Sequence, residues 1–556
     1  MADPHDEFVF APLGGVGEIG MNLAVYGLGT PRRKTWVAVD FGVSFAGDDL
    51  PGVDLIMPNI DFLIEQRKNL AGIVLTHAHE DHFGALFDLW PRIQVPVYAT
   101  PFTAALIEAK RQSEPGAPEI EVKTIPLGSR FNVGPFDIEF VTVAHSIPES
   151  NALIIRTPHG AVLHTGDWKI DPTPLIGQPT DETKLRALGD EGCLAMIGDS
   201  TNAVREGRSP SEADVARTLT SLIGRARARV AVTTFASNIA RIKAVADAAR
   251  AADREIVIVG RAMDRLVQVA RETGYLDGVR DFRPADAYGY LPPDKVVALC
   301  TGSQGEPRAA LARIAMDDHP EVTLSRGDVV IFSSRTIPGN EKAVSRVING
   351  LVFQGVEVIT DRTHLVHVSG HPRAAEVADM YAWVRPQIAV PVHGEHLHLH
   401  EHAKIARAAG VRDVVECQNG DVIRLAPLPH GKVDEIVAGR LYKDGRLIVP
   451  AAAPAVSDRR KLSFAGMVSI ALVMDGKGEV VDGPEFELIG IPDLNAAGVT
   501  MESIVEEAMM GTLDSLPRAR RRDPDTVAEA LRRAVRAAVA QSWGKKPLCL
   551  VHVMTV

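Results

Sequence analysis

The sequence LTHAHEDHFGAL, residues 75–86, places three histidines and two carboxylates within six consecutive residues. It follows the apolar run AGIVL, which predicts a buried strand, and FGALFDL then predicts the start of a helix. The titratable side chains therefore lie in a loop at the carboxyl end of a strand, where α/β layers place their ligands. A solvated polar loop is one interpretation. A metal site is favoured, because desolvating four such groups together without a cation would be costly.

The spacing within this loop indicates two ions. Alternation brings His77 and His79 within reach of one ion, and Asp81 and His82 within reach of a second. Imidazole nitrogens and carboxylate oxygens suit Zn²⁺ or Mn²⁺. Two divalent metal ions need more ligands than one loop supplies, so we expect single ligands at later strand ends. The candidates that follow apolar runs are His145, His164 with Asp167, and His393.

Composition sets the broad class of the protein. The chain has 556 residues, which indicates several domains, and its 46% apolar and 24% charged content is ordinary for a globular protein. Four scattered cysteines argue against a disulfide framework and a cysteine zinc site. The start MADPHDEFVF lacks the features of a secretory signal, and no apolar run approaches the roughly 18 residues of a membrane span. We therefore expect a cytoplasmic protein with no membrane association.

The net charge of −11 argues against a nucleic-acid partner when taken alone. Local clusters or bound cations can reverse the field where a substrate binds. A long segment between GDST (198–201) and VHVSGH (366–371) repeats a β-branched strand, a polar turn and a helix, which predicts an inserted α/β domain. Its turn residues Ser237 and Asn238 fit helix capping as well as a binding role.

The order of the motifs resembles the bacterial ribonuclease J family of β-CASP nucleases with the metallo-β-lactamase fold. The matching motifs, from about Leu13 to about Gly420, are GGVGEIGMN, THAHEDH, HSIPES, HTGDWKID, GDSTNA, TFASNI, TGSQGEP, IPGNE, HVSGH and PVHGE. The resemblance implies an α/β fold class: a metallo-β-lactamase αββα sandwich, an inserted β-CASP α/β domain and a small C-terminal α+β domain. The expected boundaries are 1–205 and 356–430 for the sandwich, 206–355 for the insert, 431–460 for a linker and 461–556 for the last domain.

The resemblance also implies a ligand set. One ion would be held by His77, His79 and His145, and a second by Asp81, His82 and His393, with Asp167 bridging the two. Asp40, in VAVDFG, is implied as a residue that orients a ligand. The alternative for Asp40 is a turn residue at the end of a strand. We expect His164 to support the site without binding metal, and we leave Asp199 outside the metal set as a residue of the domain junction.

Phosphodiester hydrolysis fits such a site, because a water between two divalent ions loses a proton near neutral pH and becomes a nucleophile. The catalytic residues would be Asp81, Asp167 and His371. For His371 two roles stay open: donating a proton to the leaving 3′ oxygen, or binding phosphate.

The activity implied is that of a ribonuclease in RNA maturation and decay. It would be a 5′→3′ exonuclease that prefers 5′-monophosphate RNA, and it would also act as an endonuclease. The implied partners are single-stranded RNA, a homodimer or homotetramer, and proteins of RNA degradation. The implied substrate-binding residues are His367, Ser369, Gly370 and His371 of the HVSGH loop, with Ser237, Asn238 and Arg241 from the insert.

Other features allow more than one interpretation. The histidines 396, 398, 400 and 402 begin a predicted helix after His393 and are expected to be solvated, with His396 or His398 near the site as the alternative. GMVSIALVMDGKGEVV predicts a hairpin, Asp523 and Pro524 predict a helix start, and KKPLCLVHVMTV predicts a last strand. A DNA nuclease, a small-molecule hydrolase and a non-catalytic scaffold are the competing functions.

Overall fold

The computed structural model describes residues 6–556, which divide into two compact units. The first unit extends to Leu441 but leaves out Phe45–Leu55, which belong with Tyr442–Val556 in the second unit. The strands β4 (Ser44–Phe45), β5 (Leu55–Pro58) and β23 (Arg440–Asp444) lie where the chain passes from one unit to the other. None of the helices within residues 6–556 has the length and hydropathy that crossing a bilayer requires.

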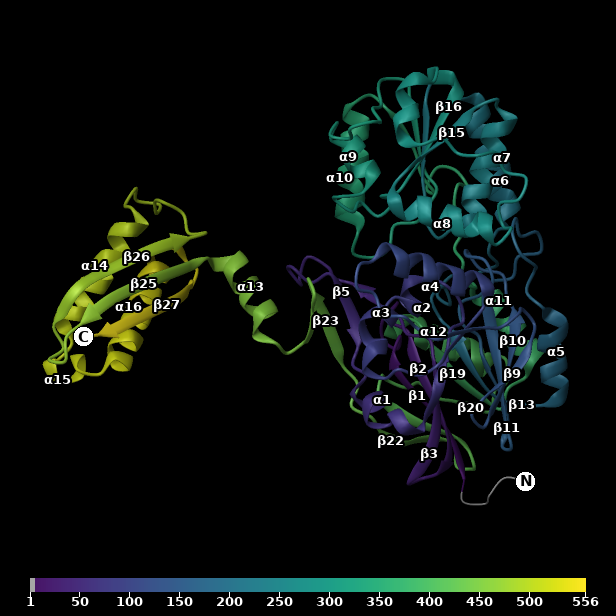
Figure 1. Cartoon of the computed structure of the whole chain (residues 1–556), viewed down its shortest axis with the longest axis horizontal. Coiled ribbons are helices and arrows are strands. Elements are labelled where there is room, and N and C mark those ends of the chain that lie inside the picture. Colours follow the sequence, from purple (N-terminus) through teal and green to yellow (C-terminus); the bar gives the residue numbers. More distant parts are fainter. Residues whose placement is uncertain (1–5) are drawn as a thin grey trace. The chain divides into compact units, whose positions relative to one another are not determined.

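Two sheets packed face to face form the centre of the first unit (Figure 1). The first sheet has the order β22 (Gly431–Glu435), β21 (Asp421–Ala426), β1 (Glu7–Gly14), β2 (Leu23–Thr30), β3 (Arg33–Val39), β6 (Leu70–Val74), β7 (Val97–Ala99) and β8 (Val122–Thr124). The second sheet has the order β20 (Asp413–Val414), β19 (Ile388–Val392), β13 (Cys193–Asp199), β12 (Gly160–His164), β11 (Asn151–Thr157), β10 (Phe136–Thr142) and β9 (Arg130–Val133).

Aromatic and branched side chains fill the space between the sheets, because alternate residues of each strand point inward. Phe8 and Phe10 of β1 and Phe136 of β10 are fully buried there. Helices pack on the outer face of the second sheet through side chains such as Trp383. The helices of one outer layer are α1 (Asp61–Glu65), α3 (Leu86–Leu89) and α4 (Pro101–Ser113). Those of the other are α5 (Glu182–Glu191), α11 (Ala374–Val384) and α12 (His396–Ala408). The layers make an αββα sandwich, so the predicted fold of this part is confirmed.

The inserted domain leaves the sandwich after β13 and returns before α11. Its sheet is entirely parallel, with the order β15 (Glu255–Val259), β16 (Val296–Cys300), β14 (Val230–Thr233), β17 (Val329–Phe332) and β18 (Glu357–Ile359). Figure 1 shows helices on both sides of this sheet. They are α6 (Glu212–Arg225), α7 (Ile239–Ala251), α8 (Arg261–Glu272), α9 (Ala310–Ala315) and α10 (Glu341–Phe353). The predicted α/β insert is confirmed.

The second unit has its own small core. The strands β25 (Met467–Met474) and β26 (Val480–Ile489) form the predicted hairpin, and β27 (Leu548–Thr555) pairs in parallel with β25. The other elements are β24 (Leu447–Pro450), α13 (Pro454–Ala465), α14 (Met501–Ser515), α15 (Arg518–Arg521) and α16 (Pro524–Trp543). Asp523 caps α16 by accepting a hydrogen bond from the backbone N–H of Asp525, so the predicted helix start is confirmed.

Two expected boundaries differ from the observed elements. The expected linker 431–460 is not a plain linker: its first residues form β22, which pairs with β21 in the first sheet, and its last residues begin α13. The insert also continues past residue 355, since β18 pairs with β17. Proline, alanine and charge suggested a linker at 431–460, but local composition does not show which segments pair with a neighbouring strand, as β22 and β18 do.

We expect Leu531→Ala to destabilise the second unit selectively. Leu531 is fully buried on the inner face of α16, and removing such a side chain costs about 2–5 kcal/mol through lost burial and a residual cavity. Differential scanning calorimetry of the full chain would show a lowered transition for the second unit only. Arg533→Ala, on the exposed face of the same helix, is the matched control. A single transition lowered as a whole would contradict independent folding of the unit.

Candidate metal centre

The predicted ligands come together at one edge of the sandwich because the strands that precede them end there. His77 and His79 follow β6, Asp167 follows β12 and His393 follows β19 directly. The strands β12, β13 and β19 run parallel, so their carboxyl ends meet at the same edge of the second sheet. In the first sheet, the loop between β6 and α2 (Glu80–Phe83) carries His77 and His79 toward that edge. Residues far apart in the chain are thereby brought within contact distance.

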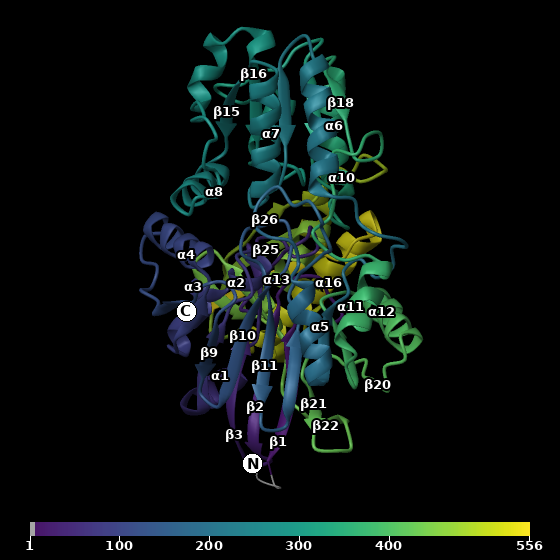
Figure 2. The same cartoon turned by 90° about the vertical axis from the view of Figure 1, so that its right-hand side faces the viewer.

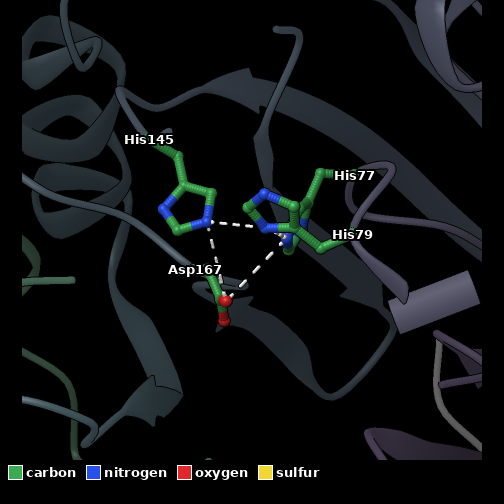
Figure 3. Close-up of side chains that lie close together, drawn as sticks. All are labelled: His77, His79, His145 and Asp167. Carbon is green, nitrogen blue, oxygen red and sulfur yellow. Dashed lines mark hydrogen bonds and ion pairs between the residues drawn. The ribbon is translucent and has the colours of Figure 1, made fainter. Parts of the chain in front are cut away.

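The first group consists of three imidazoles and one carboxylate (Figure 3). Nδ1 of His79 lies 3.0 Å from Nε2 of His77 and 3.0 Å from Nε2 of His145. Both Nε2 atoms lie 3.8 Å from Oδ2 of Asp167. Burial holds the pKa of His77 and His79 well below its ordinary value and lowers the pKa of His145 to about 4. The three rings are therefore neutral and offer nitrogen lone pairs.

The second group shares Asp167 with the first. Nε2 of His82 lies 3.2 Å from Oδ2 of Asp167, and Nε2 of His393 lies 3.5 Å from Oδ1. The carboxylate of Asp81 lies 3.6 Å from Nε2 of His82 and 3.9 Å from Nε2 of His393. The seven predicted ligands thus form two groups that meet at one carboxylate, and the ligand atoms within each group lie within 4.8 Å of one another.

The chemistry of these atoms fits a cation. Oδ1 of Asp167 and Nε2 of His393 are buried without a hydrogen-bond partner. In the first group, Nε2 of His77, Nδ1 of His79 and Nε2 of His145 converge on one point. Each neutral imidazole has only one N–H, so these three nitrogens cannot all be satisfied by hydrogen bonds to one another. Buried polar atoms without partners are costly, and a divalent ion bound by imidazole and carboxylate would satisfy all of them. Zn²⁺ or Mn²⁺ therefore fits both groups.

Asp40 orients the second group. Its carboxylate accepts a hydrogen bond from Nδ1 of His82 at 2.7 Å and from the backbone N–H of Thr76 at 2.8 Å. Asp40 also has φ 63°, a left-handed conformation that a side chain adopts at a cost. Asp40 is therefore both a turn residue at the end of a strand and a residue that orients a candidate ligand, so the two interpretations of it hold together. His164 lies outside the two groups and pairs with the hydroxyl of Tyr26 at 2.9 Å.

Asn22 holds the last ligand and was missed by the sequence analysis. Its side-chain oxygen accepts a hydrogen bond from Nδ1 of His393 at 2.7 Å, which leaves Nε2 of that ring facing Asp167. Its amide group donates to the backbone oxygen of Asp81 at 3.1 Å. Asn22 stands at the end of the motif GGVGEIGMN, and its position in that motif was the only signal in the sequence.

The HVSGH loop (residues 367–371) contacts the predicted metal ligands. Nδ1 of His371 donates to Oδ2 of Asp199 at 2.8 Å, and Asp199 is buried at the end of β13. Burial opposes protonation of His371, but the carboxylates of Asp199 and Asp167 outweigh it and raise its pKa to about 9. Asp199, expected to be only a junction residue, thus positions His371, and it joins Asp167, His371 and His393 in a further candidate metal-binding group.

Two other residues shape this loop. The amide of Asn202 donates to the hydroxyl of Ser369 at 2.8 Å and to the backbone oxygen of His371 at 3.3 Å. The backbone oxygen of Gly370 accepts from Nδ1 of His145 at 2.7 Å. A Cβ at Gly370 would lie 2.5 Å from the His145 ring, so only glycine fits there. Ser369 and Gly370 therefore lie at the metal groups, and His367 precedes them, half-buried, with Nδ1 unpartnered.

Two of the substrate contacts predicted from the insert are wrong. The Arg241 side chain is fully buried, with Nη2 donating to Glu212 at 2.8 Å, so it cannot contact RNA. Asn238 is buried and caps α7, as its oxygen accepts from the backbone N–H of Arg241. Ser237 remains half-exposed. Capping, the alternative considered for these turns, explains Asn238, and the burial of Arg241 depends on partners that the sequence pattern did not reveal.

The expectation for the histidines of α12 is wrong at one position. His402 is fully buried, with Nδ1 2.8 Å from the Ser200 hydroxyl and Nε2 2.8 Å from the Tyr381 hydroxyl. His396 and His400 are exposed, and His398 is half-buried. Helical periodicity turns every fourth residue inward, and His402 occupies such an inward position against α11.

Known protein families match four segments of the chain. Residues 35–185 match the beta-lactamase superfamily domain, and residues 227–351 match the beta-CASP domain of ribonuclease J. Residues 355–415 match the Zn-dependent metallo-hydrolase RNA specificity domain, and residues 454–556 match the ribonuclease J C-terminal domain. These matches follow the division of the fold into sandwich, insert and C-terminal domain.

Individual proteins match over nearly the whole chain. Ribonuclease J of Sinorhizobium meliloti is 53% identical, covering 99% of this chain and 98% of that protein. Ribonuclease J of Thermus thermophilus is 38% identical, covering 86% of this chain and 84% of its own. A crystal structure of a protein of unknown function from Enterococcus faecalis shares the fold, with a TM-score of 0.52 and 16% identity over 75% of this chain and 100% of that one. The site geometry and these matches over most of the chain show that the chain belongs to the ribonuclease J family of metallo-β-lactamase-fold hydrolases.

Proposed function

We propose that this hydrolase is a metal-dependent ribonuclease that cleaves phosphodiester bonds of single-stranded RNA in RNA maturation and decay. It acts as a 5′→3′ exonuclease on 5′-monophosphate RNA, and it also cleaves internally. The observation that supports this most directly is the convergence of six predicted ligand side chains on a seventh, Asp167. The relatives that match the chain over most of its length carry the name ribonuclease J.

The residues divide into roles around the scissile phosphate. A pair of Zn²⁺ or Mn²⁺ ions would supply an activated water and would offset the charge that develops on the phosphate. Asp167 belongs to both ligand groups, and the side chain of Asp81 is 29% exposed, so water can reach it. Asp199 occupies Nδ1 of His371, so Nε2 of this ring is left to meet the substrate. His371 either protonates the leaving 3′ oxygen or binds the phosphate.

The HVSGH loop is the proposed pocket for the 5′ phosphate. The Ser369 hydroxyl accepts hydrogen bonds from Asn202 and from the backbone N–H of His371, so its own proton is free to be donated to a phosphate oxygen. His367, two residues before Ser369, and the half-exposed Ser237 of the insert are the further polar groups proposed for this pocket. A pocket that fits one terminal phosphate would favour RNA with a 5′ monophosphate over RNA with a triphosphate.

Assembly and location remain part of the proposal. The C-terminal domain belongs to the second unit and has its own core, which supports a role in forming a homodimer or homotetramer. Proteins of RNA degradation are the expected further partners, and the cytoplasm is the expected location.

The proposed activity is tested with RNA labelled at the 5′ or the 3′ end and carrying a monophosphate or a triphosphate. With Mn²⁺ or Zn²⁺ present, we expect release of labelled mononucleotide from the 5′ end of monophosphate RNA, and little from triphosphate RNA. His79→Ala removes a nitrogen from the first ligand group and should abolish both activities. Activity that persists in His79→Ala, or preferential cleavage of DNA or of a small thioester, would overturn the proposal.

Ser369→Ala tests the phosphate pocket. We expect about a tenfold loss in the ratio of cleavage rates for 5′-monophosphate over 5′-triphosphate RNA, since one hydrogen bond to a charged group is removed. Internal cleavage of an RNA with both ends blocked should be nearly unchanged. Ser345→Ala, at an exposed position of α10, is the control. An unchanged ratio would remove Ser369 from the pocket.

Asn22→Ala tests the support of the metal groups. The loss of the hydrogen bond to Nδ1 of His393 frees the ring, and such supporting contacts typically contribute 10–100-fold to metal affinity. Metal content after dialysis against a graded chelator series should fall at lower chelator concentration than in the unmodified chain. Asn132→Ala, on exposed β9, should behave like the unmodified chain. Equal metal retention in the Asn22 and Asn132 variants would contradict this role.

A further inference from the structure

The inserted domain is attached to the sandwich at two places, and each attachment adjoins a loop that carries a candidate metal ligand. The first lies at Lys169 and Asp171, just after Asp167. The second lies at Glu149, in the loop that starts with His145. Figure 2 shows the two sides: α8 of the insert lies over α4 of the sandwich, and α6 descends on the opposite side.

The first attachment is a buried chain of alternating charges. Nζ of Lys169 lies 3.0 Å from Asp171 and 3.6 Å from Glu212, and Glu212 in turn accepts from Arg241. All four side chains are almost fully buried. Removing one member would leave an uncompensated buried charge, so such an arrangement resists separation.

Backbone contacts reinforce the same side. The two segments that connect the domains run side by side, since the backbone N–H of Ala374 donates to the oxygen of Arg205 at 2.9 Å. The buried carboxylate of Glu376 accepts from the backbone N–H groups of Ile170, Ser209 and Arg373, each at 2.9 Å. This side therefore acts as a fixed joint.

The second attachment is much slighter. The hydroxyl of Tyr275, in the turn after α8, donates to Oε1 of Glu149 at 2.9 Å. The other oxygen of Glu149 accepts from the backbone N–H of Phe102, at the start of α4, at 2.7 Å. The rings of Phe102 and Tyr275 meet edge to face with centroids 5.8 Å apart. Tyr275 and Glu149 are both half-buried, so water can reach this contact.

The conformation of Glu149 indicates that this contact is built into the loop. Glu149 has φ 59°, in the left-handed region, which a non-glycine residue adopts only when its surroundings require it. The strained backbone directs one carboxylate toward both α4 and Tyr275. Burial raises the pKa of Tyr275 and the adjacent carboxylate raises it further, so the phenol stays a hydrogen-bond donor.

We propose that the Tyr275–Glu149 contact is a latch that determines which RNA reaches the metal groups. With the latch closed, a free end threads between the domains to the metal groups. An RNA without ends gains access only when the insert swings about the buried joint and the latch opens. Tyr275 is thus a specificity-determining residue for internal cleavage against cleavage from an end. The inference rests on the ribonuclease activity proposed above.

The test compares a circular single-stranded RNA with a linear 5′-monophosphate RNA of the same sequence. Tyr275→Phe removes the hydroxyl but keeps the ring against Phe102. We expect the rate on the circle to rise about tenfold, since a hydrogen bond to a charged acceptor opposes opening and tenfold corresponds to about 1.4 kcal/mol. The rate on the linear RNA should change less than twofold, so the ratio of the two rates is the readout. Tyr290→Phe, at a tyrosine of the same domain that is 90% exposed, is the matched control.

The outcomes separate this inference from the function on which it rests. Degradation of the linear RNA with an equal ratio for Tyr275→Phe and Tyr290→Phe would overturn the latch and leave the ribonuclease proposal standing. Failure to cut the circle in any variant, with the linear RNA degraded, would also overturn the latch. No cleavage of the linear RNA by the unmodified chain would overturn the ribonuclease proposal and the latch with it. Thermal unfolding of Tyr275→Phe should match that of the control, which excludes general loosening as the cause.

Discussion

The carboxylate of Asp167 is the constraint on which the structure of the site depends. It is almost fully buried, and Nε2 atoms of four histidines lie within 3.8 Å of its oxygens. The imidazoles of His393 and His82 outweigh the effect of burial and hold the pKa of Asp167 well below its ordinary value. A buried carboxylate among neutral and charged rings is stable only with positive charge beside it, and two divalent ions would provide it. The sandwich makes such a cation site possible because strands of both sheets end at one edge and bring the ligand side chains together there.

A common rule governs the histidines around that carboxylate. One ring nitrogen is held by a neighbour, and the other is thereby directed inward. The pairs that hold Nδ1 are His77 with Thr76, His82 with Asp40, His145 with the backbone of Gly370, and His393 with Asn22. His371 differs, because the nitrogen held by Asp199, Nδ1, is also the one that lies 3.8 Å from Asp167. The supporting residues come from both sheets and from the segment that returns from the insert. Orientation of the ligands therefore requires the whole sandwich to be folded.

The insert takes part in the site through this same segment. Gly370 touches His145, and Asn202, just after β13, fixes Ser369. The buried charges of Lys169, Glu212 and Arg241 join the insert to the strand end that carries Asp167. Arginine at position 241 thus contributes to domain attachment, and its full burial removes it from any surface that RNA could touch. The position of the HVSGH loop and the positions of the predicted metal ligands are consequently coupled.

The sequence alone determined the fold class, the inserted domain, and which residues meet at the strand ends. Short-range pattern was enough for the strand ends and the insert, because a β-branched run that ends in His or Asp marks both a strand and its carboxyl end, whereas the sequence yielded the sandwich and the ligand set only through its resemblance to a known family. It did not determine the supporting partners: nothing local distinguishes Asn22 from a turn residue, or Asp199 from a junction residue. It also misjudged Arg241 and His402, whose burial depends on Glu212 and Tyr381, far away in the chain. Only the tertiary structure decides which side chains are enclosed and paired, because the energy of a buried polar group is set by the neighbours that folding brings to it.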